Sequence, residues 1–136
     1  ATVGGYCYGG GLGEDAVVCG TTYIDLLGGT VVKDLYAAGT SGAVQDSIRT
    51  KQFVASATAY IEGGTARNVY GGGWKGSVGM HDTLTTSLAK DISGETYVYI
   101  GKPDGGNFIS GVPAIQRNAY GGGEGGAVYG VTTNRT

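Results

Sequence analysis

The chain has 136 residues, of which 29 are glycine and two are proline, with nine Lys and Arg against eleven Asp and Glu. This length is expected to form one domain, and the absence of a G-X-Y period excludes a collagen triple helix. The nearly balanced charge argues against nucleic acid as a partner, and no apolar run approaches the ~18 residues of a membrane-spanning helix, so no membrane insertion is expected. Tyr, Val and Thr are abundant while Leu, Met and Glu are scarce, which predicts an all-β fold.

The N-terminal part of the chain contains both of its cysteines, Cys7 and Cys19. No second cysteine pair or histidine cluster is present to complete a zinc site. We therefore favour a disulfide between them over two buried free thiols, although spacing alone does not decide between these alternatives. A disulfide would place the protein in an oxidising compartment outside the cytosol.

One glycine-rich phrase occurs four times along the chain, each time after a tyrosine, at residues 8–17, 36–44, 70–78 and 120–128. In this alignment the first copy is one residue longer than the others. A second phrase, which reads TTYIDLLGGT at residues 21–30, returns at residues 58–65 and 96–106 and alternates with the first. Self-similarity of this kind is the signature of a repeat architecture, in which each repeat packs against its neighbours.

The second phrase has the two-residue alternation of a β-strand. Within residues 57–62, Ala57, Ala59 and Ile61 share one face of the predicted strand. Aligning the three copies places Ile24, Ile61 and Ile100 at one inward position. Two outward columns of tyrosines are expected from the same alignment: Tyr8, Tyr36, Tyr70 and Tyr120 before the glycine turns, and Tyr23, Tyr60 and Tyr99 beside the isoleucines.

These features predict a parallel β-helix, or β-solenoid, of about four coils, with residues 1–136 as a single repeat unit. Stacked coils lie ~4.8 Å apart, so their corners leave no room for a Cβ along the axis, and glycine suits both this contact and turns with positive φ. Two loop insertions are expected in the third coil, at residues 79–92 and 107–115, the first with Leu84, Leu88 and Ile92 on one side of a short helix. A Greek-key β-sandwich is the alternative, because it also uses short strands and glycine turns.

The sequence begins and breaks off midway through a repeat and contains no recognisable capping segment. Its last residues followed by its first read TTNRTATVGGYCYGGG, which resembles residues 56–73. We therefore expect one period of a longer array, either in one tandem protein or made of separate subunits that join head to tail. The residues expected at this end-to-end interface are Ala1, Thr2 and Val3 on one side and Val131, Thr132 and Thr133 on the other.

Residues 69–78 and 119–128 carry the pattern V-Y-G-G-G-x-x-G-x-V most clearly after allowing Ala for the first Val in the second case. With this pattern the chain resembles, over nearly its whole length, the glycine-rich repeats of large bacterial cell-surface proteins and adhesins thought to be β-helical. The second copy, with Ala37 and Ala38 for two of the glycines, departs most. The resemblance implies a fibrous protein at the cell surface or outside the cell, and it transfers no catalytic residues.

Few residues suggest chemistry. Residues 10–18 match one calcium-binding nonapeptide, but the match is solitary, so a turn with a solvated Asp15 is favoured. His81 beside Asp82 is interpreted as a hydrated surface pair. The carboxylates are scattered over different predicted coils, so a polysaccharide-cleaving β-helix enzyme is a less favoured alternative. We expect neither catalysis nor a cofactor.

Aromatic side chains suggest a second class of function. Tyr23, Tyr60 and Tyr99, together with Trp74, would offer flat faces to sugar rings, so a glycan- or host-binding adhesin segment is the main alternative. Asn134 lies in the N-x-T sequence that ends the chain and is a candidate glycosylation site. The favoured interpretation is a structural protein whose partners are copies of itself, stacked end to end into an extracellular fibre or surface stalk.

Overall fold

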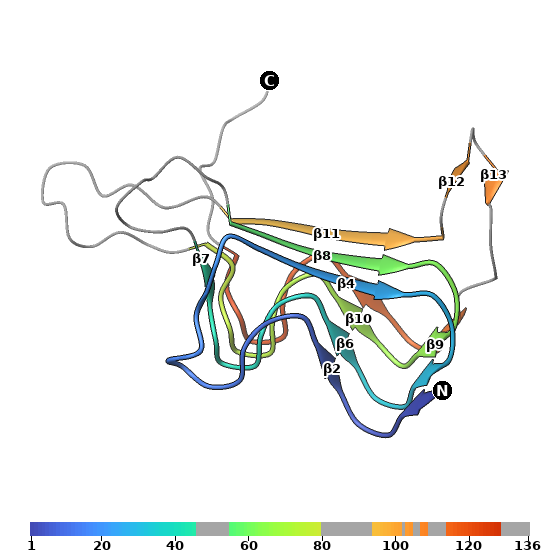
Figure 1. Ribbon diagram of the computed structural model, residues 1–136, viewed down its shortest axis with the longest axis horizontal. Helices are drawn as coiled ribbons and strands as arrows, with labels where there is room; N and C mark the ends of the chain where they lie inside the picture. The colour runs from blue at the N-terminus through green and yellow to red at the C-terminus, as the bar shows by residue number, and fades with distance from the viewer. Residues whose placement is uncertain (46–54, 80–93, 102, 105–106, 109–113, 129–136) are drawn as a thin grey trace, which may run out of the picture.

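The computed structural model describes residues 1–45, 55–79, 94–101, 103–104, 107–108 and 114–128 (Figure 1). These residues form short strands and no helix, which confirms the all-β expectation for the part of the chain described. None of the described segments is a helix long and apolar enough to cross a membrane. The helix expected around Leu84, Leu88 and Ile92 lies outside the described residues.

Three parallel sheets hold most of the strands (Figure 1). Each sheet contains equivalent strands from successive repeats, which we call the first copy (residues 1–26), second copy (30–61), third copy (65–100) and fourth copy (114–128). The first sheet contains β1 (Thr2–Val3), β5 (Thr30–Val31), β9 (Thr65–Ala66) and β14 (Ala114–Ile115). The second contains β2 (Cys7–Tyr8), β6 (Leu35–Tyr36), β10 (Val69–Tyr70) and β15 (Ala119–Tyr120). The third contains β4 (Thr21–Leu26), β8 (Ala55–Ile61) and β11 (Gly94–Ile100).

Two smaller strand pairs complete the described structure. β3 (Val18–Cys19) and β7 (Val44–Gln45) pair in parallel, while β12 (Pro103–Asp104) and β13 (Asn107–Phe108) form an antiparallel hairpin beside the sheets (Figure 1). A Greek-key sandwich is built from antiparallel strands. The parallel pairing of the larger sheets therefore argues against the sandwich alternative.

The predicted loop insertions are partly described. Residues 80–92 of the first insertion lie outside the described residues. Within the second, expected at residues 107–115, β13 belongs to the lateral hairpin, but β14 pairs in parallel with β9. The second insertion therefore ends before Ala114, because residues 114–115 already belong to the repeat.

The third sheet differs in register from the sequence alignment. Leu26 pairs with Ile61, and Ile24 pairs with Ala59, so Ile24 does not share a position with Ile61 and Ile100. The glycine corner explains the shift, because a Cβ on Gly64 would lie only 2.6 Å from the carbonyl oxygen of Gly29. Matching these corners, instead of the Tyr-Ile pairs, aligns residues 21–30 with residues 56–65 one to one, so β4 and its corner contain no inserted residue.

The first glycine-rich phrase is also longer than the sequence alignment indicated. Val18, rather than Val17, pairs with Val44, and Val44 in turn bridges to Val78 and Val78 to Val128. Val44 and Val78 are fully buried, whereas Val17 is exposed. The first copy therefore accommodates its longer phrase in an outward loop and keeps a valine in the core.

The core lies between the third sheet and the other two. Ala57, Ala59 and Ile61 are fully buried on the inner face of β8, as the two-residue alternation predicted. They pack with buried residues of the second and third copies: Val31, Leu35, Val44, Ala66, Val69 and Val78. Most of the core therefore belongs to the two central copies.

Candidate functional site

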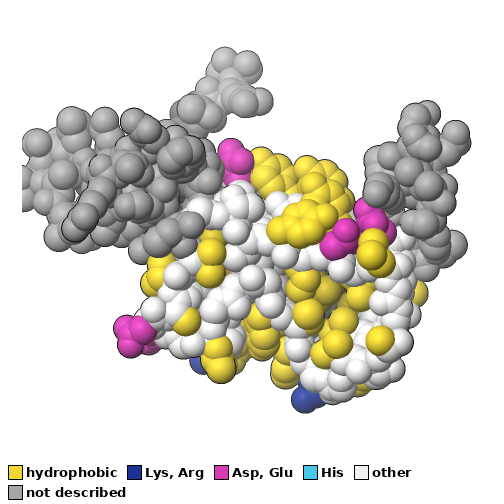
Figure 2. Space-filling model, viewed as in Figure 1, with side chains coloured by type: hydrophobic (Ala, Val, Ile, Leu, Met, Phe, Trp, Pro, Cys, Tyr) yellow, Lys and Arg dark blue, Asp and Glu magenta, His cyan; other side chains and the backbone are white. Residues whose placement is uncertain are grey.

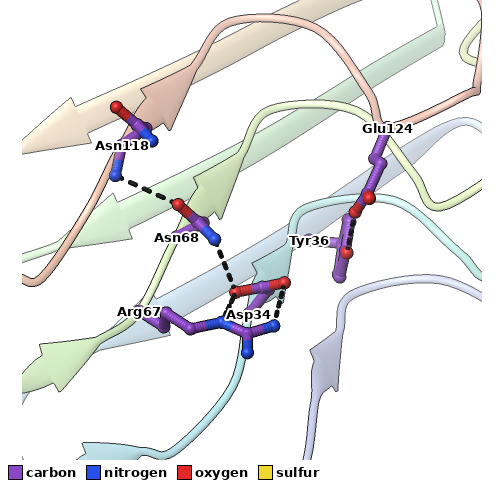
Figure 3. Close-up of polar contacts among 6 residues, drawn as sticks. All are labelled: Asp34, Tyr36, Arg67, Asn68, Asn118 and Glu124. Atoms are coloured by element: carbon purple, nitrogen blue, oxygen red, sulfur yellow. Dashed lines mark hydrogen bonds and ion pairs between the residues drawn. The ribbon is translucent and has the colours of Figure 1, made fainter.

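The tyrosines before the glycine turns form a continuous column. Tyr8, Tyr36, Tyr70 and Tyr120 pair in register, and successive ring centroids are 5.0, 4.7 and 4.8 Å apart with interplanar angles of 13° or less. Contrary to the expectation of an outward, exposed column, Tyr36 is only 1% exposed and Tyr70 is also buried. The hydroxyl of Tyr36 donates to Oε2 of Glu124 at 2.5 Å (Figure 3). The column is therefore an internal packing element over its central part.

Burial changes the ionisation of this column. Desolvation raises the pKa of Tyr8, Tyr36 and Tyr70 above the ordinary value, and the Glu124 carboxylate adds to the increase at Tyr36. These phenols therefore stay protonated at neutral pH. They serve as hydrogen-bond donors and packing groups, and a raised pKa is opposite to what a tyrosine nucleophile or general base needs.

The segment after each column tyrosine forms a glycine arch, which we define as residues 9–11, 37–39, 71–73 and 121–123. Two hydrogen bonds connect arches to the third sheet. Thr22 Oγ1 of β4 donates to the carbonyl oxygen of Ala37 at 2.7 Å, and Thr96 Oγ1 of β11 donates to that of Gly121 at 2.5 Å. Ala37 and Ala38 are fully buried here. The register of the second copy was the least certain in the sequence. Its arch nevertheless has the same arrangement, with the methyl groups of Ala37 and Ala38 in place of glycine hydrogens.

Contacts between successive arches explain the glycines. A Cβ on Gly72 of the third copy would lie 2.6 Å from the backbone nitrogen of Gly123, and one on Gly71 would lie 2.4 Å from the carbonyl oxygen of Gly121. In the fourth copy, a Cβ on Gly121 or Gly122 would have no atom of the described residues within 4 Å. These two glycines are equivalent to Gly71 and Gly72, which contact the next copy. The described residues supply no such copy next to Gly121 and Gly122.

The second tyrosine column lies on the outer face of the third sheet. Tyr60 and Tyr99 pair in register with ring centroids 4.9 Å apart and an interplanar angle of 13°. Tyr23 is displaced by two residues, because β4 pairs Asp25 with Tyr60, yet its ring still lies 5.1 Å from Tyr60 at a tilt of 48°. Figure 2 shows apolar side chains gathered over this sheet with acidic side chains beside them.

This stacking reduces the area available to a sugar. A glycan platform needs open ring faces, but Tyr60 and Tyr99 cover one another's faces. Tyr23 is 59% exposed at one edge of the column, and Tyr97, absent from the predicted set, lies beside Tyr99 with its hydroxyl donating to Glu95. Trp74 belongs to the segment that follows the glycine arch, under the ammonium of Lys75, and not to the third sheet. The structure therefore does not bring the predicted glycan-binding residues together on one platform.

A polar ladder that the sequence did not reveal connects three copies. Arg67 donates through Nε and Nη2 to the two carboxylate oxygens of Asp34, both at 2.8 Å (Figure 3). Asn68 Nδ2 donates to the same carboxylate at 2.9 Å, and Asn68 Oδ1 accepts from the backbone nitrogen of Asn118 at 3.1 Å. The Arg67 hydrogen bond is the main reason that the pKa of Asp34 is lowered. The buried carboxylate is thus held in its charged form.

Basic residues of three copies occupy successive backbone positions at the same corner. The backbone nitrogen of Arg67 donates to the carbonyl oxygen of Lys33 at 3.1 Å, and that of Arg117 donates to the carbonyl oxygen of Arg67 at 2.8 Å. Lys33 Nζ lies 4.9 Å from the ring centre of Tyr6. Residues more than 30 positions apart in the chain therefore form one basic column, which charge patterning along the sequence did not indicate.

The two cysteines occupy different sheets. Cys7 belongs to β2, pairs with Leu35 and is a free cysteine. Cys19 belongs to β3 and pairs with Gln45. The predicted disulfide is therefore not formed in this structure, because the backbone assigns the two residues to separate strand columns. Burial raises the pKa of the Cys7 thiol, which makes it less reactive than an exposed thiol.

The remaining predicted sites are only partly described. Ala1, Thr2 and Val3 lie at the open edge of the first sheet, where β1 pairs with β5 on one side only. Asp15 is exposed in the outward loop of the first copy, and no group of three possible metal ligands occurs among the described residues. The other predicted residues lie outside the described part of the chain: His81, Asp82, Val131, Thr132, Thr133 and Asn134.

The outermost copies expose the columns that the central copies bury. We define the N-terminal face as β1, β2 and Val18, and the C-terminal face as β14, β15 and Val128. Val44 and Val78 are fully buried, whereas Val128, in the same column, is 40% exposed. Tyr120 is 43% exposed although Tyr36 and Tyr70 below it are buried. Both faces therefore present ordered core positions that the described residues leave uncovered.

The chain matches no protein-family model, no curated protein and no solved structure.

Proposed function

We propose that the chain is a β-solenoid of about four coils that acts as a structural unit and extends by end-to-end stacking into a fibre or surface stalk. The parallel, in-register pairing of equivalent strands in successive copies supports the solenoid. So does the outward placement of the longer loop and the lateral hairpin, since solenoids absorb insertions outside their stacked body.

The observation that carries the stacking proposal is the pair of faces that the described residues leave uncovered. Edge strands with unpaired backbone groups and exposed core positions favour pairing with another chain, and natural proteins usually cover or charge such edges. Here the edge strands and arches present tyrosine, valine and glycine, and two exposed charged residues, Arg117 and Glu124, belong to the fourth copy. A contact between two different faces of the same unit does not close on itself, so its repetition gives an open filament.

The cellular setting and the absence of catalysis are further parts of the proposal. An extracellular or cell-surface location follows from the resemblance to glycine-rich surface-protein repeats. The raised pKa values of the column tyrosines and the commitment of the Asp34 carboxylate to Arg67 favour packing roles over catalytic ones. We rank glycan binding below assembly, because the stacked rings of Tyr60 and Tyr99 leave little open aromatic face.

Sedimentation velocity of the full 136-residue chain over a wide concentration range tests assembly. We expect an open series of oligomers that grows with concentration. Val128→Lys places a charge in the exposed valine column of the C-terminal face and should suppress the series. Val32→Lys, at an exposed position of the second copy, is the matched control and should leave it intact. A chain that stays monomeric at every concentration rules the proposal out.

A further inference from the structure

The N-terminal and C-terminal faces have the same corner length. From Thr2 to Tyr8 and from Ala114 to Tyr120 the chain runs through seven residues each, whereas the equivalent corner of the third copy, residues 65–70, is one residue shorter. The third copy pairs in register with its longer neighbours in both corner strands, so the equal corners of the first and fourth copies allow the same pairing between two chains. The internal pairing of the second copy with the first, which also has equal corners, provides the pattern.

The side chains that meet in this register fit the columns inside the molecule. Tyr8 would extend the tyrosine column from Tyr120, and Val18 would extend the valine column from Val128. Cys7 would face Ala119, and both side chains are small. Within the molecule the same column is filled by Leu35 and Val69.

The glycine arch gives the contact a direction. The first two glycines of an arch contact the following copy, as Gly71 and Gly72 contact the fourth copy, while the third contacts the preceding copy, as Gly73 contacts the carbonyl oxygen of Gly39. Gly121 and Gly122 are the glycines of the fourth copy that would contact a following copy. A face-to-face contact between two C-terminal faces would not reproduce this arrangement.

Building on the proposed function, we infer that the N-terminal face is a docking site for the C-terminal face of a second copy of this chain in one register, with Tyr8 over Tyr120 and Cys7 over Ala119. The partner is an identical unit, and the contact has one polarity. Its area is set by the corner strands and the arch.

Disulfide trapping between chains tests the register. Neighbouring strands lie about 4.8 Å apart, within the range of Cα separations that a disulfide spans. In a Cys19→Ser background, Ala119→Cys places a thiol opposite Cys7 of the next chain. Diamide then oxidises the two thiols to a disulfide and takes up two electrons and two protons as it becomes the hydrazine. We expect a ladder of covalent oligomers on a non-reducing gel.

Ala114→Cys in the same background is the matched control, because it would face Thr2 and should give no ladder. A second pair keeps the test valid if Ala119→Cys does not fold: Thr2→Cys with Ala114→Cys in a chain that lacks both native cysteines should again give a ladder.

The outcomes separate the two levels of the proposal. Assembly seen by sedimentation without a ladder from either pair overturns this register and leaves stacking intact. Covalent dimers through Cys7 alone, without longer products, show a face-to-face contact and overturn the polarity. The absence of any assembly removes both the inference and the proposed function.

Discussion

Glycine positions in the arch differ in what surrounds them, and this difference can be measured. Gly72→Ala would place a methyl group against the backbone of Gly123, whereas Gly122→Ala, one copy further, meets open space. We expect Gly72→Ala to lower the free energy of unfolding by about 1–3 kcal/mol through overpacking. Gly122→Ala should change it by less than about 0.5 kcal/mol. Urea titration at a concentration where the chain is monomeric gives both values.

Gly122→Ala has a second expected effect. If its Cα faces the next unit, the added methyl group weakens assembly at least tenfold while monomer stability is unchanged. Sedimentation velocity of the variant beside the unchanged chain measures this. Equal destabilisation of the monomer by both alanine variants contradicts the arch contacts described here.

Four residues at the far end of the arches share a left-handed backbone. Gly13, Ser41, Lys75 and Gly125 each lie five positions after a column tyrosine and have φ of 97°, 62°, 58° and 68°. A side chain is disfavoured in this region. We expect Ser41→Gly to raise the free energy of unfolding by about 0.5–1 kcal/mol, since glycine's greater chain entropy offsets part of the relief. Ser77→Gly, outside the left-handed region, is the control and should lower stability in the same urea titration.

The Asp34 carboxylate predicts a dependence of stability on pH. Its pKa is lowered in the folded state from the ordinary 3.8, so its contribution is complete above that value and is lost as the pH falls through the folded pKa. Asp34→Asn should cost about 1–3 kcal/mol at pH 7, since it removes charged hydrogen bonds to Arg67. It should also flatten the fall in stability below about pH 4. Thermal unfolding from pH 2 to 7 tests this, with the exposed Asp25→Asn as control. Parallel pH profiles for Asp34→Asn and the unchanged chain contradict it.

At the scale of elements, the buried tyrosine column is expected to contribute strongly to stability. Tyr36→Ala removes a ring stacked on both sides and leaves a cavity, which should cost about 3–5 kcal/mol. Tyr36→Phe keeps the stacking and loses the hydrogen bond to Glu124, at about 0.5–1.5 kcal/mol. Tyr97→Ala, on an exposed part of β11, should cost less than about 1 kcal/mol. In urea unfolding, Tyr36→Ala must lower the free energy of unfolding more than either of the other two variants does. Equal costs for the two alanine variants would place the column outside the cooperative core.

Sequence patterns predicted the inner strand face and the equivalent positions of the copies better than the exact strand register. The alternation of Ala57, Ala59 and Ile61 identified the inner face of β8, because one buried face imposes a two-residue period. The recurring tyrosine and glycine identified equivalent positions, since parallel stacking puts like residues together. The register of β4 was missed because Leu26 and Ile24 both satisfy an inward position, and the corner glycine decides between them.

Contacts between distant segments could not be predicted from the sequence. Tyr36 is buried between the stacked rings of Tyr8 and Tyr70, and the ladder from Asp34 to Asn118 joins residues of three copies. The sequence around Asp34 does not indicate that Arg67 is its partner. The cysteines illustrate the same limit, because a short separation along the chain says little about which column each residue enters.

At the scale of the whole molecule, the proposed assembly would use the same kinds of contacts that stabilise the fold. The central copies bury the tyrosine, valine and glycine columns on both sides, and the outer copies bury them on one side. In the proposed assembly, each added neighbour would form roughly the same interface, as expected for repeat proteins. Filament growth, as proposed, would therefore continue the internal packing of the four copies.

Fibre diffraction from aligned assemblies of the full chain tests this connection most directly. Strands that continue in register from one unit to the next predict a reflection at about 4.8 Å along the fibre axis and an axial advance of about 19 Å for each four-copy unit. Filaments whose 4.8 Å spacing lies across the axis, or discrete particles without axial order, would contradict the account.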